Sequence, residues 1–170
     1  RLHCVVFVHK GLHAGGVFPF QVELPEAYPA DEATPSVVFR TPMTHVLVDP
    51  RSGRLNVAWR FPTWAAREHT LASLLSFVRD IFLLADDELR AIVERRGALN
   101  AGLGRLCLSD FAAFRAAVQQ DARSSHSRAL EFGDADRAFL GGGSDDGRGA
   151  VGDSSSLLTT LLSPHRGGDG

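Results

Sequence analysis

Apolar and polar residues alternate along the first third of the chain with the period of two that a β-strand requires. Between residues 17 and 24, the apolar side chains of Phe18, Phe20 and Val22 fall on one face of the segment. This pattern predicts a strand with one buried face, and Pro19, which lacks an amide donor, predicts a bulge or an unpaired position. Four strands are expected in all, at residues 2–8, 17–24, 37–40 and 46–48.

The hydrophobic period changes to that of a helix after residue 70. Thr70 can act as an N-cap, and apolar residues between positions 71 and 82 recur every three or four places. A second helix is expected from Asp86, whose acidic neighbours suit a helix N-terminus, to about Arg96, with Gly97 at its end. Strands followed by helices are typical of an α+β fold.

The C-terminal part of the chain is expected to hold one more helix. Residues 99–108 are interrupted by glycines and are expected to form a connection rather than a helix. Ser109 is expected to cap a last helix, because Phe111, Phe114 and Val118 follow it at helical spacing.

Glycine, serine and aspartate dominate the remaining sequence, which buries too little apolar surface to offset the entropy of an ordered chain. We therefore expect two parts, a folded domain over residues 1–123 and a disordered tail over residues 124–170. Residues 157–162 form the only apolar patch in that tail.

The composition excludes several classes of function. The 170 residues carry 18 basic and 20 acidic side chains, a formal charge of -2, so nothing favours nucleic acid or an anionic membrane as a partner. Two cysteines form neither a disulfide framework nor a metal cluster, which fits a reducing compartment. The chain shows no signal peptide and no apolar run long enough to cross a membrane.

Three histidines near the N-terminus could suggest a metal site. His9 and His13 are four residues apart, with His3 nearby, but they lie in a strand and a glycine turn rather than on one face of a helix. We expect their side chains to be solvated, and we expect no metal or other cofactor.

Several motifs between residues 15 and 57 match the pattern of one known family. Residues 24–29 resemble its proline-tyrosine-proline turn, His45 matches the histidine of its His-Pro-Asn signature, and residues 53–57 match its Gly-x-Ile-Cys-Leu run. The chain resembles the ubiquitin-conjugating enzymes. The resemblance implies the UBC-like fold, a four-stranded antiparallel meander with C-terminal helices. That fold also begins with a helix, which we expect to be missing from this fragment and to leave part of the sheet exposed.

The resemblance also implies that the chemistry of these enzymes is lost. Asn56 stands where they have the cysteine that carries ubiquitin, and an amide forms no thioester. Leu47 stands where they have the asparagine that stabilises the oxyanion during transfer. His45 is then expected to be structural, with its ring bonded to backbone. The three positions form a degenerate site without a catalytic residue.

Residues 42–64 are similar to one group of cysteine-less variants, AKT-interacting protein, also called the Fused Toes homologue. The Leu-Val-Asp-Pro run at residues 47–50 and a later Phe-x-x-Trp spacing carry this resemblance, and Trp64 matches a tryptophan of the family's core. Val46 departs from the group's proline, and Asn56 departs from its aspartate. The resemblance implies a cytoplasmic adaptor that joins Hook-type coiled-coil proteins in a complex linking vesicles to dynein.

Three functions remain open from the sequence. The first is a non-catalytic adaptor in a Hook-type vesicle-trafficking complex. The second is a variant that binds ubiquitin or that partners an active ubiquitin-conjugating enzyme. The third is an active enzyme that uses Cys4 or Cys107, which the asparagine and leucine at the degenerate site oppose.

A fold that is retained without its chemistry must act through a surface. One candidate surface is the region 47–64, in which Trp59, Arg60 and Phe61 are the expected partner-binding residues, because tryptophan and arginine often dominate binding energy. The other candidate is the outer face of the helices between residues 86 and 118.

Overall fold

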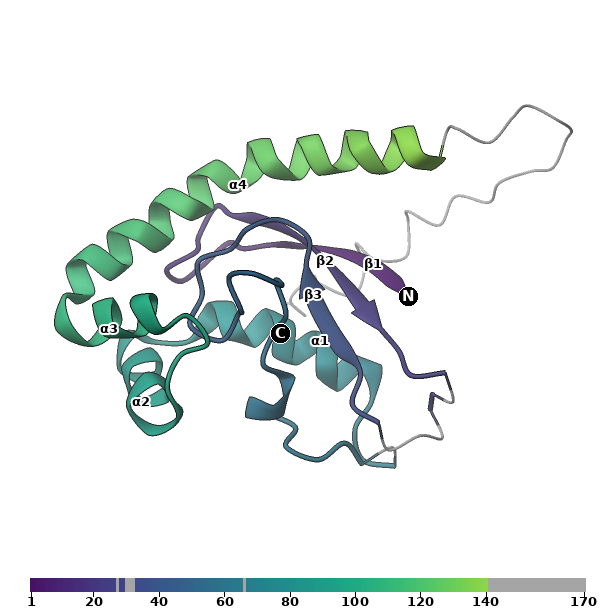
Figure 1. Cartoon of the computed structure of the whole chain (residues 1–170), viewed down its shortest axis with the longest axis horizontal. Coiled ribbons are helices and arrows are strands. Elements are labelled where there is room, and N and C mark those ends of the chain that lie inside the picture. Colours follow the sequence, from purple (N-terminus) through teal and green to yellow (C-terminus); the bar gives the residue numbers. More distant parts are fainter. Residues whose placement is uncertain (27, 30–32, 66, 141–170) are drawn as a thin grey trace, which may run out of the picture.

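A three-stranded antiparallel sheet lies at the centre of the molecule, with the helices packed around it (Figure 1). The sheet contains β1 (Leu2–Phe7), β2 (Val17–Glu23) and β3 (Ser36–Phe39), in the order β1-β2-β3. Helices follow the strands along the chain, so the α+β arrangement predicted from the hydrophobic pattern is confirmed. The computed structural model describes residues 1–26, 28–29, 33–65 and 67–140.

The bulge predicted at Pro19 is absent, because β1 pairs with β2 in one continuous register in which Pro19 lies opposite Val5. The carbonyl of Pro19 accepts a hydrogen bond from the Arg40 amide at 2.9 Å. Strand β3 ends at Phe39, so Pro19 lies just outside the β2–β3 ladder. The amide N–H that proline lacks is therefore not needed for a ladder hydrogen bond, and its absence costs little stability.

Residues 46–48 do not form the fourth strand that the sequence predicted. Val48 makes one isolated antiparallel bridge with Leu55. The turn between them is closed by the carboxylate of Asp49, which accepts from backbone amides further along the turn. Gly53 then adopts a φ of 69°, and a Cβ atom at this position would lie 2.3 Å from the carbonyl oxygen of Phe39. Only glycine fits there, because both the left-handed backbone and the close approach exclude a side chain.

Helix α1 (Leu71–Asp80) begins at the predicted cap. The Thr70 side chain accepts from the Ser73 amide at 3.1 Å, and the Ser73 hydroxyl accepts from the Thr70 amide at 2.9 Å, which completes a capping box. The Leu71 amide donates to the Tyr28 hydroxyl at 3.1 Å, which ties the helix start to the turn after β2. The helix continues into a 3-10 turn, η2 (Ile81–Leu83).

Helix α2 (Asp86–Arg96) has the predicted bounds, but the connection predicted after it is wrong, because α3 (Ala101–Ser109) is a helix. The Asn100 side chain caps α3 by accepting from the Leu103 amide at 3.0 Å. Gly104 does not break the helix. A Cβ atom there would lie 2.9 Å from the Cβ of Ala98, so this glycine lets the helix pack closely on the segment before it.

Helix α4 (Phe111–Leu140) is longer than the sequence predicted, and its N-cap is Asp110 rather than Ser109. Ser125 is fully buried, and its hydroxyl accepts from the Val17 amide at 2.8 Å. The tail predicted to be disordered from residue 124 is therefore wrong for residues 124–140, because the helix remains attached to the sheet beyond that point. Residues 141–170, including the apolar patch at 157–162, lie outside the described residues.

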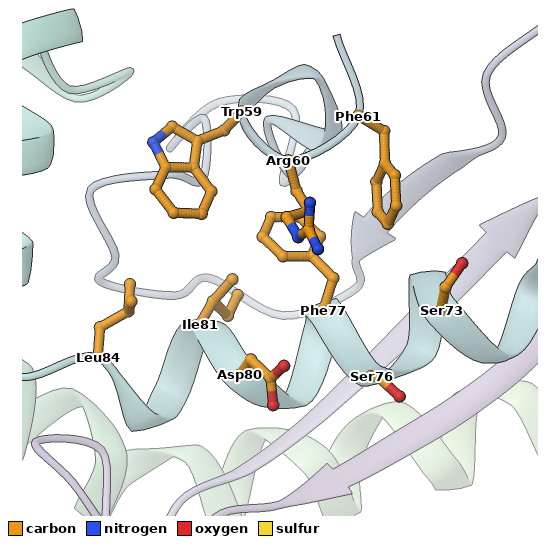
Figure 2. Close-up of a pocket in the computed structure, with 9 residues that line it drawn as sticks. All are labelled: Trp59, Arg60, Phe61, Ser73, Ser76, Phe77, Asp80, Ile81 and Leu84. Atoms are coloured by element: carbon orange, nitrogen blue, oxygen red, sulfur yellow. The ribbon is translucent and has the colours of Figure 1, made fainter. Parts of the chain in front are cut away.

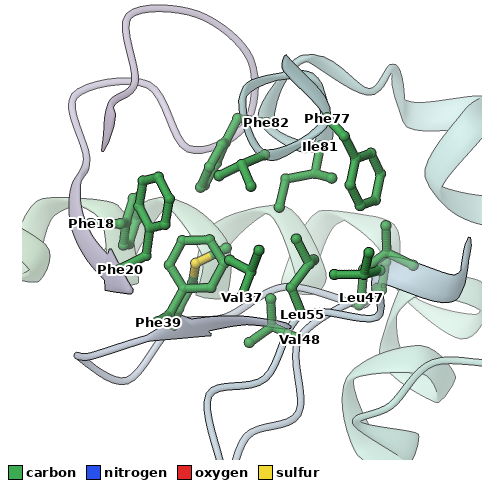
Figure 3. Close-up of a cluster of buried hydrophobic side chains, with 14 of the residues drawn as sticks. Phe18, Phe20, Val37, Phe39, Leu47, Val48, Leu55, Phe77, Ile81 and Phe82 are labelled. Atoms are coloured by element: carbon green, nitrogen blue, oxygen red, sulfur yellow. The ribbon is translucent and has the colours of Figure 1, made fainter. Parts of the chain in front are cut away.

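One face of the sheet packs against α1 and η2 to form the hydrophobic core (Figure 3). Trp64 is 1% exposed, so its predicted place in the core is confirmed. Within the described part of the chain, no helix combines the length and the apolar character needed to cross a membrane. The side chains that meet in this core include Phe18, Phe20, Val37, Phe39, Leu47, Val48, Leu55, Phe77, Ile81 and Phe82.

Candidate functional site

The structure brings together the three residues of the predicted degenerate site. The backbone amide of Asn56 donates to the Leu47 carbonyl at 2.8 Å, and the backbone amide of Leu47 donates to Nδ1 of His45 at 3.0 Å. Asn56 is half-buried at the start of the 3-10 turn η1 (Val57–Trp59), and its side chain makes no capping bond to that turn. The Leu47 side chain is 2% exposed and packs in the core. The Asn56 carboxamide is not a nucleophile, and the buried alkyl side chain of Leu47 donates no hydrogen bond to an oxyanion.

His45 is held in one neutral tautomer by the backbone. Because Nδ1 accepts from Leu47, the proton lies on Nε2, which donates to the Ile81 carbonyl at 3.1 Å. Complete burial, together with the neighbouring His13 ring, lowers the pKa of His45 to about 3. Both ring nitrogens are therefore engaged within the fold, and the ring joins the segment after β3 to the end of α1.

His13 was predicted to be solvated, and this prediction is wrong. Its side chain is 3% exposed, its Nε2 donates to the Thr44 carbonyl at 2.8 Å, and its ring centroid lies 5.3 Å from that of His45. Burial also lowers the pKa of His13. Among the described residues no three metal-ligating side chains gather in one place, so this pair of buried rings is not part of a larger ligand set.

The buried histidine pair is expected to make stability depend on pH between neutrality and mild acid. Both rings have a lower pKa in the folded chain than in the unfolded chain, so the unfolded state binds more protons as the pH falls below about 6.5. The two neutral rings contribute their full stabilisation above that pH. The free energy of unfolding decreases as the pH falls below it. Between about pH 7 and pH 5.5 the His45 ring, whose pKa is lowered to about 3, is expected to cost about 1 kcal/mol, measured by urea unfolding, and His13 acts in the same direction.

A matched pair of variants separates this effect from general acid sensitivity. His45→Asn removes one titrating ring and is expected to flatten the pH slope, whereas His9→Gln changes an exposed histidine and is expected to leave the slope unchanged. Equal slopes for the parent chain and His45→Asn would contradict the prediction.

The predicted partner-binding residues Trp59, Arg60 and Phe61 lie together at an open pocket of about 490 Å³ between η1 and α1 (Figure 2). Trp59 is half-buried, Phe61 is buried and Arg60 is exposed. The pocket's volume lies within the range of sites that bind small ligands or protruding side chains. Its remaining lining residues come from α1 and the turn after it: Ser73, Ser76, Phe77, Asp80, Ile81 and Leu84.

Aromatic rings shape this pocket. The Trp59 ring stacks on Phe77 with centroids 6.0 Å apart and an interplanar angle of 14°. The Phe61 ring meets Phe77 edge-on at 5.8 Å, and the Arg60 guanidinium lies 5.7 Å from the Phe61 centroid. The pocket therefore combines an apolar floor with one cationic group, a combination that suits a protein partner better than a reaction.

The helix side of the pocket was missed by reasoning from the sequence. Ile81 was assigned only to the apolar face of the helix, and Phe77 and the polar residues beside it were assigned no role. The signal was nevertheless present, because the six lining residues between positions 73 and 84 follow each other at steps of three, one, three, one and three, which places them on one side of a helix.

Neither cysteine lies at the degenerate site. Cys4 is half-buried in β1, and Cys107 is fully buried in α3. Burial raises the pKa of both thiols, which disfavours the thiolate that nucleophilic chemistry needs.

Comparison with known sequences gives one family. A sequence model of the family described as ubiquitin-conjugating enzyme matches residues 1–97. The chain is 29% identical to the protein crossbronx of Drosophila virilis over 127 residues, which cover 75% of this chain and 52% of that protein. It is 44% identical to AKT-interacting protein of Danio rerio over 78 residues, which cover 46% of this chain and 26% of that protein. The chain thus spans about half of the one relative's length and about a quarter of the other's.

Comparison with solved structures gives the same fold. A protein described as a novel ubiquitin-conjugating enzyme superposes with a TM-score of 0.51 at 20% identity, covering 68% of this chain and 71% of the other. The E2 domain of a Toxoplasma gondii ubiquitin conjugating enzyme superposes with a TM-score of 0.57 at 14% identity, covering 71% of this chain and 76% of the other. The UBC-like fold predicted from the sequence motifs is therefore confirmed.

Proposed function

The chain belongs to the ubiquitin-conjugating enzyme family, and on that basis we propose that it is a non-catalytic member that works as a protein-binding adaptor. The observation that carries the proposal is Asn56, an amide at the position that the family signature gives to the catalytic cysteine. The buried side chain of Leu47 beside it adds no hydrogen-bond donor. The half-buried thiol of Cys4 and the buried thiol of Cys107, both with raised pKa values, supply no alternative nucleophile.

The partner that we propose is a Hook-type coiled-coil protein, in a cytoplasmic complex that links vesicles to dynein. The similarity of this chain to AKT-interacting protein and to crossbronx supports a partner of this group rather than a partner of other family variants. The name of AKT-interacting protein describes a protein that binds another protein. The matched part covers a minority of AKT-interacting protein, so the proposal concerns this domain and the surface that it carries.

The aromatic pocket is the surface that we assign to this partner. A partly exposed aromatic side chain beside an unpaired arginine is the composition that binding hot spots favour, and among the described residues Trp59 and Arg60 provide it at an open pocket. An apolar anchor from a helical partner would bury surface against Trp59 and Phe77 without any rearrangement of the core.

Pull-down of a Hook-type C-terminal fragment tests this assignment. Trp59→Ala and Arg60→Ala are each expected to reduce binding of the fragment about tenfold or more, because each removes a central contact. Leu108→Ala, a change at an exposed leucine on α3, serves as the matched control on the other candidate surface and is expected to have little effect. Circular dichroism of every variant shows whether it remains folded.

The outcomes separate the alternatives. If folded Trp59→Ala and Arg60→Ala bind as well as the parent and Leu108→Ala does not, the C-terminal helices carry the partner. Capture of ubiquitin or of an active ubiquitin-conjugating enzyme, with no binding of the Hook-type fragment, would replace the trafficking adaptor with the second function considered above.

A further inference from the structure

Arg60 is the one charge on the rim of the aromatic pocket that is left without an opposite charge. Within the part of the chain that the structure describes, it makes no ion pair. The other charged lining residue, Asp80, is already neutralised, since one of its carboxylate oxygens accepts from Nε and Nη2 of Arg79 at 3.0 Å and 2.7 Å. Arg60 is therefore the lining charge that is free to pair with a group on an occupant.

The surroundings of Arg60 strengthen its attraction for an anion. Its guanidinium lies over the Phe61 ring, and the stacked pair of Trp59 and Phe77 lines the same pocket (Figure 2). An occupant that covers these rings would exclude water from the guanidinium, and a charge-assisted hydrogen bond is stronger in such a place than in open solvent. The planar guanidinium can hold both oxygens of one carboxylate.

The floor of the pocket is apolar, so the acidic group of an occupant must be accompanied by an apolar side chain. Phe77 and Ile81 are buried at its base, and Leu84 closes one end. Ser76, which also lines the pocket from α1, is exposed. An apolar side chain is needed to fill this floor, so a free inorganic anion would leave most of the pocket uncovered.

We propose that the pocket binds a segment of a partner protein in which an apolar anchor enters the aromatic floor and a neighbouring aspartate or glutamate pairs with Arg60. This specificity rests on the proposed adaptor function and adds the chemistry of the sequence that is recognised. A nucleic acid or an anionic membrane would require a cluster of cations, whereas this rim carries a single free arginine beside a carboxylate.

Selection from a displayed library of random peptides tests the proposal with the whole chain as bait. Peptides selected by the parent are expected to share an aromatic or aliphatic residue at a fixed spacing from an aspartate or glutamate. Replacing that acidic residue with glutamine or asparagine in a selected peptide is expected to weaken binding about tenfold, measured by fluorescence anisotropy.

Charge reversal supplies the matched control. Arg60→Glu is expected to reverse the preference, so that the same peptide carrying lysine in place of its acidic residue binds more tightly than the acidic original. Arg105→Glu makes the same charge change at an exposed arginine on α3 and is expected to leave the preference unaltered.

Three results would overturn the inference: no peptide is selected, the selected peptides share no acidic position, or their preference survives Arg60→Glu. These results can be told from failure of the proposed function. If Trp59→Ala abolishes binding of the Hook-type fragment while charge has no effect, the docking surface stands and the charge specificity falls. If the acidic peptides bind as expected but the fragment binds equally well to Trp59→Ala, the specificity of the pocket stands and the Hook-type fragment docks on another surface.

Discussion

Incubation with ubiquitin, activating enzyme and ATP is expected to leave the chain without any thiol-sensitive ubiquitin adduct. A thioester requires a thiolate at the position immediately before η1. Asn56 has an amide side chain at that position. The measurement is a non-reducing gel run beside a reduced sample. A band that vanishes on reduction and is also lost in Cys107→Ser would show that the buried thiol in α3 reacts, and would contradict the non-catalytic assignment.

The Asn56→Cys variant tests separately the two groups that the degenerate site lacks, the nucleophile and the donor to the oxyanion. The new thiol can accept ubiquitin, but Leu47 still offers no donor to the oxyanion that forms when a lysine attacks. Discharge to lysine is therefore expected to be slower, by a factor on the order of 10²–10³, than in a family member that keeps the oxyanion donor. Rapid discharge from this variant would show that Leu47 is not the second defect.

Phe82→Ala is expected to destabilise the domain by about 3–5 kcal/mol, a large part of the about 5–15 kcal/mol that holds such a domain together. The ring is 3% exposed and stacks on Phe18 with centroids 5.4 Å apart. It also meets the buried pair His13 and His45 edge-on, at 5.3 Å and 6.2 Å. Truncation would leave a cavity where the sheet, the first turn and the end of α1 converge. Urea unfolding measures the loss.

The adjacent residue provides the control for that experiment. Leu83 lies in the same 3-10 turn but is 50% exposed, so Leu83→Ala removes similar chemistry without opening a cavity, and a loss below about 1 kcal/mol is expected. Similar losses for the two variants would mean that the turn itself, rather than the burial of the Phe82 ring, sets the stability.

Local signals in the sequence predicted the elements whose causes are local. Thr70 and the apolar spacing after it located α1, because a cap and a periodic face act within a few residues. Gly104 misled the prediction of α3, because its role is to accept the close approach of Ala98, a contact that composition does not reveal. The continuation of α4 was missed for the same reason, since Ser125 is a helix residue that serves a distant strand.

The candidate site was predictable in part. Asn56 and Leu47 could be identified from the family motif, and Trp59, Arg60 and Phe61, which were predicted to bind a partner, line one pocket, while their binding role stays a prediction. The opposite wall was missed, because the helical spacing of its residues shows that they share one side of α1 but not that this side faces η1. His13 was likewise assigned to solvent because its acceptor, the Thr44 carbonyl, lies 31 residues away.

The attachment of α4 to the first hairpin has a consequence for how the domain is made. Ser125 bonds to Val17 across 108 residues, and Nε2 of His126 donates to the Gly15 carbonyl across 111 residues. During synthesis the strands β1 and β2 emerge early, yet the side chains that satisfy their turn are among the last of the described residues to appear. The hairpin must therefore wait until Ser125 and His126 have been translated, and in that interval the Val17 amide and the Gly15 carbonyl are open to chaperones and to other nascent chains.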